Sequence, residues 1–311
     1  MKRIVLALLI LAAVCMGAAG ASKVFLNIAT GGAAGTYFPL GGALAEIVNS
    51  KVAGLNATAV TSGASVANVN MLATDEVQMA FIQNDIAFYA YNGLEMFKDK
   101  PMKSLRAVAS LYNETIQIVT LSNSGVKSLA DLKGKRISVG AAGSGAEVNA
   151  RQVMEAAGIT YKDITPQYLS FAEGANGLRD GNTDVAFLTA GAPTAAVRDV
   201  AAQKDVVIVP VPKDIADKLI AKYPFYVRVK IPKDTYSKQT SEVDTVTVKA
   251  MLVTSTSLNA VLVYNVTRAL FSNLERMGQA HAQGKNINPT AAVEGLPIPV
   301  HEGADRFFRE Q

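Results

Sequence analysis

Two glycine-rich segments about a hundred residues apart constrain the fold of this chain more than any other feature. Residues 25–49 (FLNIATGGAAGTYFPLGGALAEIVN) and residues 136–158 (RISVGAAGSGAEVNARQVMEAAG) share one pattern. Each has a short apolar strand, a glycine-rich turn, a hydroxyl residue and then an amphipathic helix. Such a unit presents free backbone N–H groups and the positive end of a helix dipole at the end of a strand. Two units that face each other would form a cleft suited to an anionic small molecule.

The N-terminus has the pattern of a secretion signal. Two basic residues precede an apolar run over residues 4–16, and a small-residue Ala-Gly-Ala sequence ends at Ala21. The run is short for a membrane span, although an uncleaved anchor is the alternative. Cys15 follows Val14, where a lipoprotein signal would have a small residue, so lipidation is disfavoured. We therefore expect residues 1–21 to be a cleaved signal peptide and the mature protein to be periplasmic or otherwise extracytoplasmic.

Composition excludes several classes of function. Cleavage after Ala21 would remove Cys15, the single cysteine, and with it any disulfide, thiol nucleophile or thiolate metal ligand. The formal net charge of +4 includes the two basic residues of the leader, and no cluster of Arg and Lys with interleaved aromatic residues occurs. No second apolar run is long enough to span a membrane. We expect a soluble monomer that binds no nucleic acid, no metal and no cofactor.

The mature chain alternates strand and helix patterns, which indicates an α/β fold. A long segment rich in β-branched residues, 106–121, and an alternating strand, 245–254, are predicted to cross between two lobes. The other predicted strands are residues 24–29, 57–61, 77–82, 136–139, 165–169 and 185–188. The predicted helices are residues 37–49, 129–135, 147–157, 173–180 and 258–277, with one more that opens at residues 62–65, and residues 296–300 form an extended tail.

An internal echo supports two similar lobes. Residues 72–81 and 178–187 both finish a helix, turn on polar residues and enter a strand that ends in Ala-Phe. Because the chain crosses between the lobes twice, the first lobe is expected to be discontinuous. The expected boundaries are residues 22–113 and 248–311 for the first lobe and its C-terminal tail, and residues 114–247 for the second.

The first glycine-rich turn, residues 31–35, is the more specific candidate for ligand contact. Its glycines allow positive φ and a close approach of a ligand to the backbone. Thr36 is a candidate helix N-cap and ligand hydroxyl. Tyr37 either contacts the ligand or packs in the core with its hydroxyl satisfied.

The second turn runs into Ser144-Gly145-Ala146-Glu147, which has the spacing of a capping box. In that motif Ser144 accepts from the Glu147 N–H, and Glu147 reaches back to the cap. One interpretation is simply a well-capped helix. The other is that the amides around Gly145 and Ala146 bind a carboxylate without any arginine.

Polar residues also follow two predicted strands, at the end where ligands bind in open α/β sheets. Gln83 and Asp85 come after residues 77–82, and Asp85 either receives a ligand ammonium or caps the next helix. Thr189 follows residues 185–188, where it either donates to a ligand or starts a helix.

Motifs typical of catalysis are missing. The only histidines, His281 and His301, lie far from the glycine-rich turns in sequence, and neither has metal-ligand spacing. Neither turn matches a P-loop or a dinucleotide-binding fingerprint, and no nucleophile elbow occurs. Paired carboxylates would be a catalytic signal if Glu114, Asp85 and Glu147 came together in the fold. Solvated or structural roles are expected for these acids instead. The sequence therefore argues against an enzyme.

Taken together, the motifs resemble those of the TAXI-type solute receptors, the extracytoplasmic binding proteins of one branch of TRAP transporters. The segment TGGAAGTYFPLGG, residues 30–42, and the segment VGAAGSGAE, residues 139–147, carry most of the resemblance. Residues 62–66, 186–194 and 295–301 extend it over essentially the whole mature chain.

The resemblance implies an α/β periplasmic-binding-protein type II fold, with two lobes joined by a two-strand hinge and a ligand cleft between them. It implies capture of a small carboxylate, such as glutamate, glutamine or a related acid, and delivery to a TRAP membrane permease. Ala146 stands where the family commonly has threonine, and Ala33-Ala34 replaces a more glycine-rich loop, which leaves the ligand open. The candidate ligand contacts are Thr36, Tyr37, Ser62, Ser65, Gln83, Asp85, Ser144, Gly145, Ala146, Phe187 and Thr189.

Three other functions stay open at this stage. A receptor for an ATP-driven (ABC-type) importer would have the same fold. An enzyme on the same two-lobed scaffold would turn its ligand over. A surface or immunogenic protein would bind no small molecule.

Overall fold

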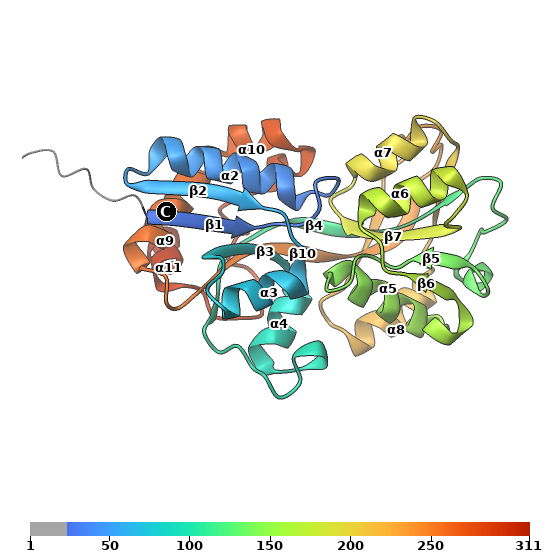
Figure 1. Ribbon diagram of the computed structural model, residues 1–311, viewed down its shortest axis with the longest axis horizontal. Coiled ribbons are helices and arrows are strands. Elements are labelled where there is room, and N and C mark those ends of the chain that lie inside the picture. The colour runs from blue at the N-terminus through green and yellow to red at the C-terminus, as the bar shows by residue number, and fades with distance from the viewer. Residues whose placement is uncertain (1–23) are drawn as a thin grey trace, which may run out of the picture.

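The computed structural model describes residues 24–311 and contains two α/β lobes that share one ten-stranded sheet (Figure 1). The strand order is β2-β1-β3-β10-β4-β7-β5-β6, with β8 paired to β4 and β9 paired to β10. The predicted signal peptide, residues 1–21, lies outside the described residues. Between residues 24 and 311, no helix combines the length and the apolar character needed to cross a membrane.

The first lobe is built on parallel strands with helices on both faces. Strand β1 pairs with β2 and β3 in parallel. The predicted apolar face of the first helix is confirmed, since Leu40, Leu44, Ile47 and Val48 are all buried. The elements of this lobe are β1 (Val24–Ala29), α2 (Tyr37–Lys51), β2 (Leu55–Val60), α3 (Ser65–Ala73), β3 (Met79–Gln83), α4 (Asn84–Asn92), α9 (Ala260–Phe271), α10 (Leu274–Ala280) and α11 (Glu302–Arg309), with 3-10 turns at Glu95–Phe97 and Ala282–Asn286.

The second lobe repeats the parallel arrangement. Strand β5 pairs in parallel with β6 and β7, and β8 and β9 add antiparallel pairs to the crossing strands. Its elements are β5 (Arg136–Ser138), α5 (Gly145–Ala156), β6 (Thr165–Gln167), α6 (Phe171–Asp180), β7 (Val185–Ala190), α7 (Ala195–Ala201), β8 (Val206–Val209), α8 (Lys213–Lys222) and β9 (Val227–Ile231), with 3-10 turns at Leu129–Leu132 and Tyr161–Asp163.

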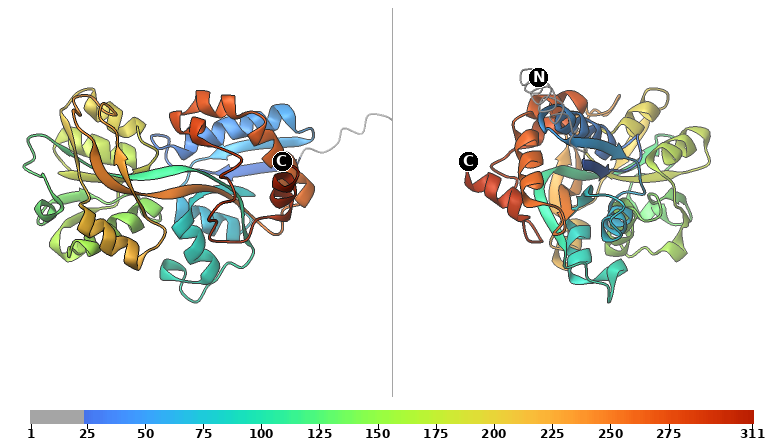
Figure 2. Two further views of the ribbon diagram at one scale, coloured as in Figure 1. Left: turned by 180° about the vertical axis from the view of Figure 1, so that it is seen from behind. Right: turned by 60° about the vertical axis from the view of Figure 1, so that its left-hand side comes forward.

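Two long antiparallel strands, β4 (Leu105–Leu121) and β10 (Val243–Ser255), run from one lobe into the other (Figure 2). Strand β10 pairs with β3 in the first lobe and with β9 in the second. Strand β4 pairs with β10 as far as Thr115 and with β7 from Thr115 onward. The change of partner therefore falls at the Thr115–Thr247 pair, where the polar site described below also lies.

The predicted helix over residues 258–277 is wrong in one respect, because the structure has two helices there. Helix α9 ends at Phe271, and α10 begins at Leu274. Asn273 leaves the helical region of φ/ψ, and its side chain donates to the Ala269 carbonyl at 2.7 Å. Asparagine side chains compete with helical backbone bonds in this way, so the apolar periodicity continues through a break in the backbone.

Asn68, on α3, fixes the first glycine-rich turn to the sheet. It is fully buried, and its Nδ2 donates to the carbonyls of Thr30 and Phe81 at 2.6 and 2.7 Å. Its Oδ1 accepts from the Ser62 hydroxyl. One side chain therefore bonds to the carbonyl that follows β1, to a carbonyl within β3 and to a hydroxyl in the turn before α3.

We expect Asn68→Leu to lower the free energy of unfolding by about 2–4 kcal/mol, because leucine keeps the volume but leaves buried carbonyls without a donor. Denaturant unfolding of the ligand-free protein would measure this. Asn70→Leu, on the exposed face of the same helix, is the matched control and should change stability by about 0.5 kcal/mol or less. Equal stability of the two variants would contradict the role given to Asn68.

Candidate ligand-binding site

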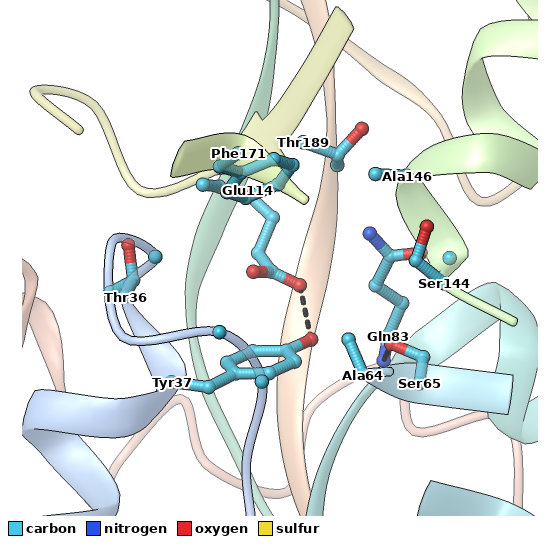
Figure 3. A pocket seen from close by; sticks show the side chains of 15 residues that line it. Thr36, Tyr37, Ala64, Ser65, Gln83, Glu114, Ser144, Ala146, Phe171 and Thr189 are labelled. Atoms are coloured by element: carbon cyan, nitrogen blue, oxygen red, sulfur yellow. Dashed lines mark hydrogen bonds between the residues drawn. The ribbon is translucent and has the colours of Figure 1, made fainter. Parts of the chain in front are cut away.

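A cavity of about 50 Å³ lies between the lobes, at the point where the two glycine-rich turns face each other (Figure 3). It is bounded by the turn after β1, the ends of β3 and β7, the middle of β4 and the start of α5. Its lining residues are Gly31, Gly32, Gly35, Thr36, Tyr37, Ala64, Ser65, Gln83, Glu114, Ser144, Gly145, Ala146, Phe171, Thr189 and Ala190. Of the predicted contacts, the structure brings together Thr36, Tyr37, Ser65, Gln83, Ser144, Gly145, Ala146 and Thr189.

Three predicted contacts do not line this cavity. Ser62 lines a neighbouring cavity, and its hydroxyl bonds to Asn68 and to the Thr30 carbonyl. Asp85 is fully buried, and its carboxylate accepts from the Ile86 N–H and from Asn149 Nδ2, both at 2.9 Å. Phe187 is buried in the hydrophobic core of the sheet. Asp85, chosen as the partner of a ligand ammonium, is thus bonded to protein groups instead.

The N-terminus of α5 is open toward the cavity. Ser144 is the N-cap, and its Oγ accepts from the Glu147 N–H at 3.1 Å, as predicted. The reciprocal bond of the capping box is not formed, because the Glu147 carboxylate accepts from the Tyr161 hydroxyl at 2.7 Å. The first amides of a helix have no intrahelical acceptor, so the N–H groups of Gly145 and Ala146 remain for a ligand anion.

The N-terminus of α3 is already occupied by the opposite lobe. The amides of Val66 and Ala67 donate to the Gly143 carbonyl at 3.1 and 3.0 Å. Thr36 holds the N-cap position of α2 without a capping bond, and its Oγ1 accepts from the Gly191 N–H at 3.1 Å. These bonds join the two sides of the cleft directly, so the structure is a closed arrangement of the lobes.

Glu114 is the buried acid that the sequence analysis did not select. It lies on β4 with 2% of its surface exposed, and its Oε2 accepts from the Tyr37 hydroxyl at 2.5 Å (Figure 3). Burial raises the pKa of Glu114 to about 8, although the Tyr37 hydrogen bond opposes this. Burial beside Glu114 also raises the pKa of Tyr37. At neutral pH the empty cavity therefore holds a mostly protonated carboxyl group.

Glu114 supplies the one carboxyl group among the residues that line the cavity. None of the lining residues is basic, and within residues 24–311 no cluster of His, Cys, Asp and Glu is arranged to hold a metal. Gln83 extends toward Ser144, and its buried Oε1 has no hydrogen-bond partner (Figure 3). The Gln83 carboxamide lies against Gly145, so the site offers amide donors for an anion at that end and the Glu114 carboxyl oxygens for a cation at the other.

Phe171, at the start of α6, is another lining residue that sequence reasoning missed, as are Ala64 and Ala190. Its position depends on how α6 packs beside the first glycine-rich turn, since a Cβ at Gly35 would contact the Phe171 ring. No local sequence pattern predicts such a contact. Glu114 did carry a signal, since an acid in the middle of a long apolar strand is unusual.

The fold and the site together define a periplasmic-binding-protein type II fold, in which two lobes close over a small polar cavity. Residues 28–311 match the NMT1-like family, and the chain belongs to that family.

Solved structures share this fold at low identity. A protein from Bordetella bronchiseptica RB50 is 16% identical, with a TM-score of 0.58 over 93% of this chain and 98% of that one. PhnD1 from Prochlorococcus marinus (MIT 9301), solved with methylphosphonate, is 10% identical, with a TM-score of 0.57 over 84% and 90%. A putative L-cystine ABC transporter from Listeria monocytogenes is 17% identical, with a TM-score of 0.49 over 85% and 95%.

Proposed function

We propose that this protein is an extracytoplasmic solute-binding protein, not an enzyme, that captures a small amino acid and presents it to a membrane transporter. The observation that carries the proposal is the enclosed cavity between the lobes, which has open helix amides at one end and Glu114 at the other. The ligand carboxylate would take the amides of Gly145 and Ala146. The ligand ammonium would take Glu114, the role first expected of Asp85.

Tyr37 and Gln83 complete the proposed contacts. The Tyr37 hydroxyl already bonds to Glu114 and so orients its carboxyl group. The Gln83 carboxamide lies beside Gly145, where its Nε2 would donate to the ligand carboxylate, and Glu114 would accept the ammonium hydrogens. A keto acid lacks those hydrogens, and this is why the proposal prefers an amino acid to a keto acid.

Capture would follow from closure of the lobes around the crossing strands. Only the closed form supplies contacts from both lobes, so a ligand shifts the population toward it. We propose residues 22–113 and 248–311 as one moving body and residues 114–247 as the other. The partner change at Thr115 and Thr247 marks the place where β4 and β10 would flex.

The class of transporter is the finer part of the proposal. The sequence motifs favour a TRAP permease of the TAXI branch, but the comparisons do not bear that out. Taken together they support the alternative, an ABC-type importer, better than a TRAP permease. Uptake of radiolabelled ligand by vesicles with the cognate permease decides between them. ATP dependence identifies an ABC importer, whereas dependence on an ion gradient without ATP identifies a TRAP permease.

The location and state of the mature protein are part of the same proposal. A cleaved leader over residues 1–21 would place it in the periplasm. The cavity between the lobes is lined by residues of a single chain and so requires no second copy, which agrees with a monomer. Mass spectrometry of the protein from cell envelopes would give the mature N-terminus. An intact N-terminus or a cytosolic location would contradict the proposal.

Thermal shift of the mature protein against amino acids, dicarboxylates and keto acids tests the function. The chain has no Trp, so an added dye reports unfolding. A ligand at a hundred times its dissociation constant adds about 2.7 kcal/mol of stability and must raise Tm. The protein is first unfolded and refolded to remove any carried-over ligand. Flat traces across all three classes would contradict the proposal and favour a surface protein without a small-molecule ligand.

A further inference from the structure

A second cavity of about 260 Å³ adjoins the first. The two share the lining residues Gly32, Ala64, Ser144 and Phe171. We call the second one the vestibule. Its lining residues are Gly32, Ala33, Ala34, Ser62, Gly63, Ala64, Ala141, Ser144, Ser170, Phe171 and Ala172.

No charged side chain lines the vestibule, and of its three serines only Ser144 keeps a hydroxyl hydrogen without an acceptor among the described residues. Its side chains are mainly alanine methyls and the Phe171 ring. The Ser62 hydroxyl bonds to Asn68, the Ser170 hydroxyl bonds to the Glu173 carboxylate at 2.7 Å, and Ser144 accepts from the Glu147 N–H. Because alanine methyls and the Phe171 ring make up most of the lining, the surface presented to a ligand is mainly apolar.

The volumes of the two cavities determine which part of a ligand each can hold. A water needs about 10–15 Å³ of such volume, so the inner cavity holds only a few groups of that size, as many as an α-amino-carboxylate head. Any further ligand atoms must pass Phe171 and Ala64 into the vestibule. A side-chain carboxylate there would lose water and find no cation, and its donors would be limited to the Ser144 hydroxyl and backbone N–H groups such as those of Phe171 and Ala172.

We propose that the ligand is an amino acid with an uncharged, apolar side chain, and that this side chain occupies the vestibule while the head group occupies the inner cavity. This rests on the proposed function and narrows it. The glutamate or glutamine expected from the family resemblance is replaced by an aliphatic side chain of three or more carbons. The alanines at positions 33 and 34 then supply methyl contacts that a glycine loop would lack.

Titration calorimetry of the refolded wild-type protein with alanine, 2-aminobutyrate, norvaline, leucine, glutamine and glutamate tests the inference. Each added methylene should tighten binding about fourfold, since its burial is worth about 0.8 kcal/mol. Leucine should bind at least about tenfold more tightly than glutamate, because only glutamate carries an unpaired charge into the vestibule. Glutamate tighter than leucine would overturn this inference and leave the proposed function standing. No binding by any of the six would overturn both.

Ala33→Arg gives the second arm, because it places a cation at the exposed rim of the vestibule without touching the inner cavity. The ratio of glutamate affinity to leucine affinity should rise at least about tenfold relative to wild type. Ala202→Arg, at an exposed position at the end of α7, adds the same charge away from the cleft and should leave the ratio unchanged. An equal shift in both variants, or none in Ala33→Arg, would overturn the assignment of the vestibule.

Discussion

Replacing Gly145 by valine is expected to weaken ligand binding by about fivefold to a hundredfold while leaving the ligand-free protein folded. A Cβ at position 145 would overlap the Gln83 carboxamide, which belongs to the opposite lobe. Overpacking of this kind costs about 1–3 kcal/mol, and a tenfold loss of affinity corresponds to about 1.4 kcal/mol. Since the clash exists only when the lobes are closed, it opposes closure and spares the fold of each lobe.

The measurement is titration calorimetry for affinity and dye-based Tm for the ligand-free protein. Gly42→Val is the matched control, because Gly42 lies on α2 and a Cβ there meets no other atom within 4 Å. The control should keep the wild-type affinity. If Gly145→Val also bound with wild-type affinity, the start of α5 would not be part of the binding site.

The second large effect concerns the proton on Glu114. At pH 7 a carboxyl group with a pKa of about 8 is mostly protonated, and an incoming ammonium favours its ionised form. Binding of an amino acid should therefore release close to one proton, and its affinity should rise up to about tenfold per pH unit until the pH passes about 8. Calorimetry at pH 7 in two buffers of different ionisation enthalpy measures the released proton.

Glu114→Gln should remove both the proton release and the pH dependence, and should weaken amino-acid binding about tenfold or more, because a neutral amide replaces the carboxylate. Tyr37→Phe is the companion variant. It keeps the carboxyl group but loses the hydrogen bond that favours ionisation, so proton release should persist. An unchanged proton count in Glu114→Gln would show that another group takes the ammonium.

The same carboxyl group governs stability without ligand. Its pKa is raised from the ordinary 4.5 to about 8 on folding, so the stabilising protonated form is fully present below pH 4.5 and is lost as the pH rises toward 8. Wild type should lose up to about 1.4 kcal/mol per pH unit across that window. Glu114→Gln lacks this loss, so its Tm advantage over wild type should grow between pH 5 and pH 8. Asp85, with a pKa raised from 3.8 to about 6, adds an earlier loss in both proteins and cancels from the comparison.

Local patterns predicted the parts of the site that depend on a single strand–turn–helix unit. The turn before Thr36 and the cap at Ser144 lie where the glycines and hydroxyl residues indicated. The long crossing strands were also predicted, because a run rich in apolar and β-branched residues, such as β4, is a strand signal. Helix α8 and strand β9 were not predicted, although the alternation in Val227–Ile231 is a strand signal.

Contacts between the lobes could not be predicted from local sequence patterns. Glu114 enters the cavity because β4 brings it beside Tyr37, and the Thr36 hydroxyl accepts from the Gly191 N–H instead of capping its own helix. Both pairings join residues far apart in sequence. Asp85 has the composition of a ligand contact, but its carboxylate meets Asn149 from α5. Which polar groups stay free for a ligand is therefore decided by tertiary packing.

The Gly143 carbonyl at the start of α3 has a consequence for the energetics of transport. It occupies the place that an anion would take at the N-terminus of α3, so a protein carbonyl replaces a ligand anion at that one helix terminus. Part of the free energy of closure is then independent of what is bound, and a fraction of unloaded molecules closes spontaneously. A transporter that recognises only the closed shape would also bind this fraction of ligand-free receptors. Such binding delivers no ligand, so the fraction sets the minimum frequency of unproductive binding events.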